Sequence, residues 1–131
     1  MKITPIIFLI SFILITGFSY SVPQSVTEEI TAAIRAADDE KLATYLNNTV
    51  DVTLPKNEGT YSKNQAQLII KDFFSKTPPD SFKIDHEGSS HNGSLYLIGS
   101  YKSTDKTYRV YILIKKISGK YLIQQLQFED E

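Results

Sequence analysis

The sequence lacks cysteine and tryptophan and contains a single methionine. Without cysteine the protein forms no disulfide bond, has no thiolate metal site and has no cysteine nucleophile. The folded protein is therefore expected to be stable through packing alone. Most of the large aromatic surface for that packing has to come from eight tyrosines and seven phenylalanines.

An excess of positive charge is also missing. Lysine and arginine number 14, aspartate and glutamate number 15, and the formal net charge is −1. Proteins that hold a phosphate backbone carry a surplus of basic residues. The composition therefore argues against nucleic acid as a partner.

A long apolar run is absent except near the N-terminus. Lys2 precedes a mostly apolar run over residues 6–15, and small residues follow at Gly17, Ser19 and Ser21. This order is typical of a secretory signal peptide that is cleaved after Ser19 or Ser21. The run is shorter than the ~20 residues of a membrane-spanning helix. An uncleaved membrane anchor is therefore the less favoured alternative.

These features predict a signal peptide over residues 1–21 and a single domain over residues 22–131. The protein is then exported, either to the periplasm or out of the cell, and has no membrane span after cleavage. Lipid anchoring is not expected, because there is no cysteine in the cleavage region.

Apolar residues recur at helical spacing in three segments. The first covers residues 26–37, and the second is a short helix over residues 39–46. The third begins with a capping box at Ser62 and Gln65, and it ends before Pro78-Pro79 because proline cannot continue a helix.

Alternation of apolar and polar residues, typical of strands, follows in most of the remaining chain. Strands are expected at residues 50–54, briefly at 60–61, and then at 81–90, 94–103, 107–117 and 120–128. The Asn92-Gly93 pair predicts a type I′ turn, in which both central residues have positive φ. Further turns are expected at residues 104–106 and at Ser118-Gly119.

Helices first and a four-stranded meander last indicate an α+β domain, with the helices packed on one face of a curved antiparallel sheet. Short segments along residues 22–131 also carry a recognisable family pattern. They are Val50-Asp51-Val52-Thr53-Leu54-Pro55, Glu58-Gly59, Tyr61-Ser62-Lys63 with Gln65-Ala66, Lys71-Asp72-Phe73-Phe74, Pro78-Pro79, His86 with Gly88-Ser89-Ser90, and Tyr108-Arg109-Val110-Tyr111-Ile112.

Through these segments and the order of its elements, the chain resembles a small family of secreted proteins of unknown function from Bacteroidota. That family lies within the nuclear transport factor 2-like (cystatin-like α+β) superfamily, in which the sheet wraps around the helices to form a cone. The resemblance implies a fold and a compartment. It implies no catalytic residue, because the family has no assigned reaction.

Alternation along the strands predicts a few polar side chains on the core side of the sheet: His86, Tyr101, Tyr108 and Gln124. They would line a pocket for a small apolar ligand if the cone is open. His86 is also the candidate general acid or base, since its pKa suits proton transfer near neutrality. A structural histidine is the simpler interpretation, because Asp85 and Glu87 are expected on the opposite face and could not orient its ring.

Neither a metal nor a cofactor is expected. Asp85, His86, Glu87 and His91 are close in sequence, but strand alternation separates them and His91 falls at a turn. No catalytic residue is assigned, and the protein is not expected to be an enzyme.

The face of the meander that points away from the helices is apolar in its middle. The residues expected on this outer face are Tyr96, Ile98, Arg109, Tyr111, Leu113, Tyr121 and Ile123. A solvent-facing sheet surface normally carries polar residues, and tyrosine and arginine are enriched at interfaces. The outer face therefore suggests a homodimer or a partner protein, and an ordinary mixed surface is the alternative. The expected function is a non-catalytic binding module, with an enzyme that uses His86 as the alternative.

Overall fold

The computed structural model describes residues 25–131, so the predicted signal peptide lies outside the described residues. The elements follow in the order α1 (Val26–Arg35), α2 (Asp39–Ala43), β1 (Leu46–Leu54), β2 (Asn57–Ser62), α3 (Lys63–Lys76), β3 (Ser81–Ser89), β4 (Leu95–Ser103), β5 (Lys106–Ile117) and β6 (Lys120–Asp130). The predicted α+β class and the closing meander are confirmed.

Side-chain caps begin the two longer helices, and the cap of α3 is at the residues that the sequence predicts. The Ser25 hydroxyl accepts a hydrogen bond from the Glu28 amide at 3.2 Å. At α3, Ser62 accepts from the Gln65 amide at 3.3 Å, and the Gln65 side chain accepts from the Ser62 amide at 3.4 Å. Each cap satisfies backbone donors that the first helical turn leaves free.

The second helix is shorter than predicted. It ends at Ala43, and Leu46 already pairs with Ile123 on β6. The Ile123 amide also donates to the Tyr45 carbonyl at 2.7 Å. The prediction that Tyr45 and Leu46 are helical is wrong, because these backbone groups bond to a strand far away in sequence.

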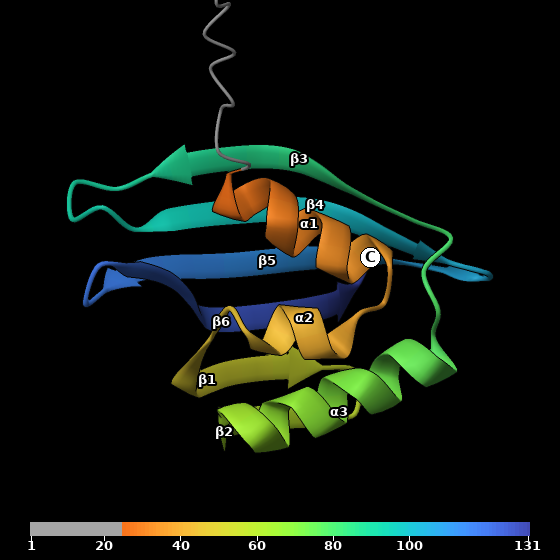
Figure 1. Cartoon of the computed structure of the whole chain (residues 1–131). Helices are drawn as coiled ribbons and strands as arrows, with labels where there is room; N and C mark the ends of the chain where they lie inside the picture. Colours follow the sequence, from red (N-terminus) through yellow and green to blue (C-terminus); the bar gives the residue numbers. More distant parts are fainter. Residues whose placement is uncertain (1–24) are drawn as a thin grey trace, which may run out of the picture.

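The six strands form one sheet in the order β2-β1-β6-β5-β4-β3. β1 and β6 are parallel, and the other neighbouring pairs are antiparallel. Figure 1 shows the three helices on one side of the curved sheet, where α1 packs on β3 and α3 packs on β1 and β2. The opposite, outer face carries none of the described helices. Within residues 25–131, no helix has the length and hydropathy needed to cross a bilayer.

The turn with two positive φ values is not at the pair predicted to form it. Gly93 has a φ of 80° but Asn92 has no positive φ, so the Asn92-Gly93 pair does not form a type I′ turn. Ser118 and Gly119 instead have φ values of 50° and 81°, and the flanking residues Ile117 and Lys120 pair directly. The two-residue turn with both φ values positive therefore joins β5 to β6.

Aromatic rings fill the space between α3 and the sheet. Phe73 lies next to Tyr101, Tyr108 and Phe128, with ring centroids 5.7, 5.6 and 4.9 Å away. The Phe74 ring is stacked on Tyr101 at 6.3 Å. These five residues, here called the aromatic cluster, are all buried.

Candidate functional site

A β-bulge in β3 reverses the orientation predicted for His86. Ile84 pairs with Gly99, whereas His86 pairs with Ile98, so Asp85 is an extra residue in the strand. Side chains alternate along a strand, and one extra residue turns every following side chain to the other face. His86 therefore lies on the outer face and is exposed, which corrects the prediction that it faces the core.

Asp85 is held in this bulge by polar contacts. The Ser100 hydroxyl donates to the Asp85 carboxylate at 2.6 Å, and the Lys83 ammonium lies 3.6 Å from its other oxygen. The Ser100 hydrogen bond, with a smaller contribution from Lys83, holds the pKa of the Asp85 carboxyl below its ordinary value. The pairing between Ser100 and Asp85 depends on the cross-strand register and has no signal in the local sequence.

The same bulge brings Glu87 to the helix side of the sheet, where it pairs with Leu97. Glu87, Leu97 and Thr27 of α1 border a shallow depression of about 290 Å³ at the sheet edge. Strand alternation predicts Glu87 on the outer face, so sequence reasoning misses this carboxylate. Glu87 remains exposed, and the described residues contain no cluster of three or more groups able to hold a metal ion.

A second bulge, in β6, changes the predicted outer face. Leu113 pairs with Gln125 and Ile114 pairs with Ile123, so Gln124 is the extra residue. Ile123 is consequently buried in the core, and Leu122 takes the outer position. The prediction of an outward Ile123 is therefore wrong.

Tyr121 changes sides for the same reason. It is half-buried and packs against the core, and the Lys116 ammonium lies 5.6 Å from the centre of its ring. Tyr121 therefore belongs to the helix side of the sheet, which corrects its predicted outward position.

The predicted pocket residues do not converge on one cavity. Gln124 sits in the bulge of β6, where its side-chain oxygen accepts a hydrogen bond from Asn47 at 3.3 Å. Its amide nitrogen is buried and has no partner among the described residues. Tyr101 and Tyr108 lie together, with ring centroids 6.1 Å apart, inside the aromatic cluster.

Tyr101 has a structural role in that cluster. Its side chain is fully buried, and its hydroxyl donates to the Thr77 carbonyl at the end of α3 at 2.5 Å. Burial raises the pKa of Tyr101 far above its ordinary value, since the charged phenolate would lose its contact with water. Tyr101 is therefore neutral at physiological pH.

Four apolar side chains adjoin one another in the middle of the outer face. Tyr96 pairs with Leu113 and Ile98 pairs with Tyr111 across the β4–β5 ladder. We call these four residues the outer patch. Tyr96 is the most exposed of them, at 38 %.

Polar and small residues surround the outer patch. Gln125 and Gln127 flank it on β6, while His86 and Gly88 flank it on β3. A β-carbon at Gly88 would lie 2.3 Å from the Tyr96 ring, so the ring lies across the bare Gly88 backbone. Arg109 is exposed beside the outer patch, between Ser100 and Glu129.

Comparison with known proteins identifies related sequences and folds. The model of the family described as "Domain of unknown function (DUF4783)" matches residues 27–129. A crystal structure of a DUF4783 family protein from Bacteroides uniformis is similar at 25% sequence identity and a TM-score of 0.76, over 82% of this chain and 98% of that one. A second, from Bacteroides ovatus, is similar at 23% identity and a TM-score of 0.76, over 82% and 97%.

More distant structures share the fold alone. A putative dehydratase of the NTF2-like family from Streptomyces avermitilis is similar at 8% identity and a TM-score of 0.61, over 80% of this chain and 90% of that one. The predicted nuclear transport factor 2-like fold is thereby confirmed. No curated protein matches the sequence significantly.

Proposed function

Because the chain belongs to the DUF4783 family, whose function is unknown, we propose from its own sequence and surface that it is an exported, non-catalytic interaction module that pairs with a second copy of itself. Export rests on the signal-like order of residues 1–21. The observation that carries this proposal is the outer patch, a contiguous apolar surface on the sheet face that the helices leave uncovered. Contiguous apolar patches on soluble proteins commonly mark interaction surfaces.

The outer face has the dimensions of a stable interface. Six strands at a spacing of ~4.8 Å, with about nine residues per strand at ~3.3 Å each, make a face of roughly 700 Å². A standard interface buries about 800 Å² on each partner. Covering apolar area contributes about 25 cal/mol for each Å² removed from water.

Charges around the outer patch favour a second copy over an unrelated partner. Lys83 on β3 and Arg109 on β5 share one row of the outer face through Ser100. Glu129 on β6 continues this row, because it pairs with Arg109. A two-fold axis that runs parallel to the strands, between β4 and β5, would set β3 of one copy over β6 of the other and bring Lys83 opposite Glu129.

Other observations weigh against a small ligand inside the cone and against an enzyme that uses His86. The aromatic cluster occupies the space in which a small apolar ligand would bind inside the cone. His86 makes no hydrogen bond with another described side chain, so no group orients its ring for proton transfer. Both points support a role in protein contact.

A charge in the outer patch tests the proposal. Leu113→Asp would bury an unpaired carboxylate in the middle of a sheet-to-sheet contact, which is costly. The unmodified protein is expected to be a dimer at high micromolar concentration, and Leu113→Asp a folded monomer with an unchanged far-UV circular dichroism spectrum. Light scattering over a concentration series measures both.

Leu68→Asp is the matched control. Leu68 lies on α3 and is 66 % exposed, so the same substitution there should leave the dimer intact. An unmodified protein that stays monomeric, or a Leu113→Asp variant that still dimerises, would overturn self-association through the outer patch.

A further inference from the structure

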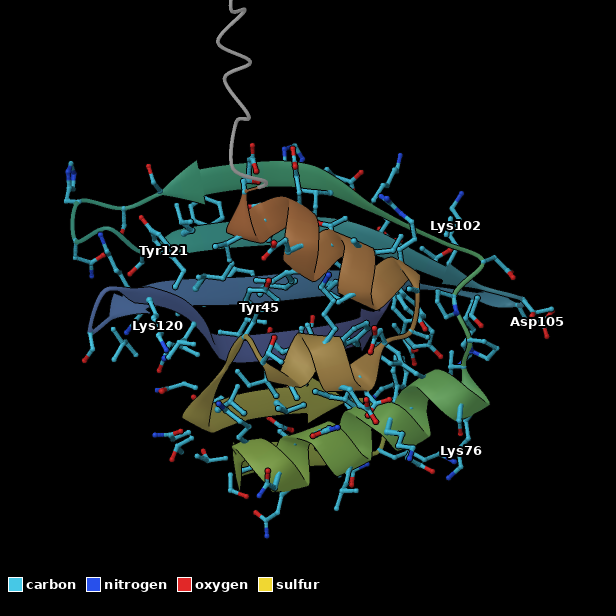
Figure 2. All side chains as sticks on the ribbon, in the orientation of Figure 1. Tyr45, Lys76, Lys102, Asp105, Lys120 and Tyr121 are labelled. Carbon is cyan, nitrogen blue, oxygen red and sulfur yellow. The ribbon has the colours of Figure 1, made fainter. Side chains whose placement is uncertain are left out.

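A groove of about 310 Å³ opens at one end of the domain, where the end of α3, the β1–β2 turn and the start of β5 meet. In Figure 2 this end is marked by two labelled side chains, Lys76 in the last turn of α3 and Asp105 in the neighbouring β4–β5 turn. The volume is at the lower end of the ~300–1,000 Å³ of small-molecule sites. It is separate from the outer patch, and we call it the α3 groove.

The floor of the α3 groove is an edge of the aromatic cluster that reaches solvent. Phe73 is 8 % exposed and is the most exposed member of the described core, while Leu54 and Tyr108 are each 5 % exposed. Phe73 and Tyr108 meet edge to face at 5.6 Å. A ligand on this floor would therefore contact two aromatic rings already held in place by packing.

A polar atom accompanies this apolar floor. The Tyr108 hydroxyl makes no hydrogen bond to another described residue, and it is not completely buried. It therefore reaches water and can donate a hydrogen bond to a bound molecule. The Tyr101 hydroxyl, in contrast, already donates a hydrogen bond to the Thr77 carbonyl.

The rim of the α3 groove is basic. Lys56, Lys76 and Lys106 line it, against the single carboxylate of Asp72. Asp72 pairs with Lys76 at 3.0 Å, and Lys106 lies 3.8 Å from Asp130, but these exposed pairs are weak.

Lys56 is the best placed of the three ammonium groups. It belongs to the two-residue turn that joins β1 to β2, where Leu54 pairs with Asn57, so its backbone is fixed beside the groove. It forms no ion pair with another described residue. Lys76 lies at the carbonyl end of α3, where the helix dipole disfavours an anion. An anionic group should therefore sit closer to Lys56 than to Lys76.

We propose that the α3 groove binds a small organic carboxylate. Its apolar body lies on Phe73 and Tyr108, and its carboxylate lies between Lys56 and Lys106, within reach of the Tyr108 hydroxyl. An apolar floor with a few polar groups at the rim is the usual composition of a small-molecule site. Inorganic phosphate would meet the same lysines but has no part that covers the rings.

Amide chemical-shift titrations with phenylbutyrate, phenylbutanol and inorganic phosphate test the proposal. Phenylbutyrate should shift the amides around Phe73, Lys56 and Lys106 at millimolar concentration and bind about tenfold more tightly than its neutral alcohol. Inorganic phosphate should cause no comparable shifts.

Two lysine variants localise the carboxylate. Lys56→Met keeps most of the length of the side chain but removes its charge. It should weaken the binding of phenylbutyrate about two- to fivefold, the range expected for one exposed ion pair. Lys71→Met, on α3 but outside the groove, should leave the affinity unchanged.

Equal affinity for phenylbutyrate and phenylbutanol, or an unaffected Lys56→Met variant, would overturn the carboxylate assignment. The absence of shifts in the groove amides with every probe would overturn the site itself. Neither outcome bears on self-association, because the Leu113→Asp variant keeps the whole α3 groove.

Discussion

Replacing Phe74 by alanine measures how much the aromatic cluster contributes to stability. Phe74 is 4 % exposed, stacks on Tyr101 with an interplanar angle of 13°, and lies 6.2 Å from the Phe73 ring. A buried phenylalanine removes ~150–250 Å² from water, which corresponds to about 4–6 kcal/mol at ~25 cal/mol per Å². Alanine retains part of that burial, so we expect a loss of about 3–5 kcal/mol.

Such a loss is a large share of the about 5–15 kcal/mol that stabilises a typical domain. For a domain of this size it corresponds to a decrease in Tm of roughly 12–40 °C. Urea unfolding followed by far-UV circular dichroism gives the midpoint and the m-value, and the m-value should not change. If Phe74→Ala does not fold, Phe74→Leu should still fold with a loss below about 1.5 kcal/mol.

Leu68→Ala on the same helix is the control for helix propensity. Leu68 is 66 % exposed, so its truncation should change the unfolding free energy by no more than about 0.5 kcal/mol. A loss below about 1 kcal/mol for Phe74→Ala, with an unchanged m-value, would refute the assignment of this helix face to the core.

Two further substitutions test the core and the sheet. Burial raises the pKa of Tyr101, so the unfolded chain loses this proton first and stability should fall as the pH rises above about 10. In urea melts at neutral pH, Tyr101→Phe should lower the free energy of unfolding by about 0.5–1.5 kcal/mol, because it removes the hydrogen bond to Thr77. Above pH ~10, the free energy of unfolding of Tyr101→Phe should fall less steeply than that of the unmodified protein. Parallel falls would contradict the argument. Gly99→Ala should lower the free energy of unfolding by about 1–3 kcal/mol, because its β-carbon would lie 2.5 Å from the Lys83 carbonyl oxygen. Gly59→Ala is the control: its β-carbon has room, so the free energy of unfolding should hardly change.

Much of the architecture is predictable because its causes are local. The capping box at Ser62 and Gln65 begins α3, and the two prolines after it end the helix within a few residues of the predicted position. Alternation locates the four strands of the meander to within a few residues of their observed bounds. The family segments then indicate how these elements are arranged, and the observed fold agrees.

The turns show where local signals fall short. Asn92-Gly93 is the stronger type I′ signal in the sequence, yet the two-residue turn with positive φ values forms at Ser118-Gly119. The β5–β6 ladder continues up to Ile117 and Lys120, which leaves only two residues for that connection. How far a ladder continues depends on both strands, so the turn residues alone do not determine the turn.

The sequence by itself determined the helix starts, the strand segments, the α+β class and the family. The tertiary structure decided which way the candidate residues face. Asp85 and Gln124 each add one residue to a strand, and each reverses the side chains beyond it, which moves His86 outward and Ile123 inward. A bulge forms where two strands pair, and it is stabilised by contacts such as the hydrogen bond from Ser100 to Asp85 across the ladder. That information lies between segments distant in the sequence, which is why periodicity within one strand could not reveal it.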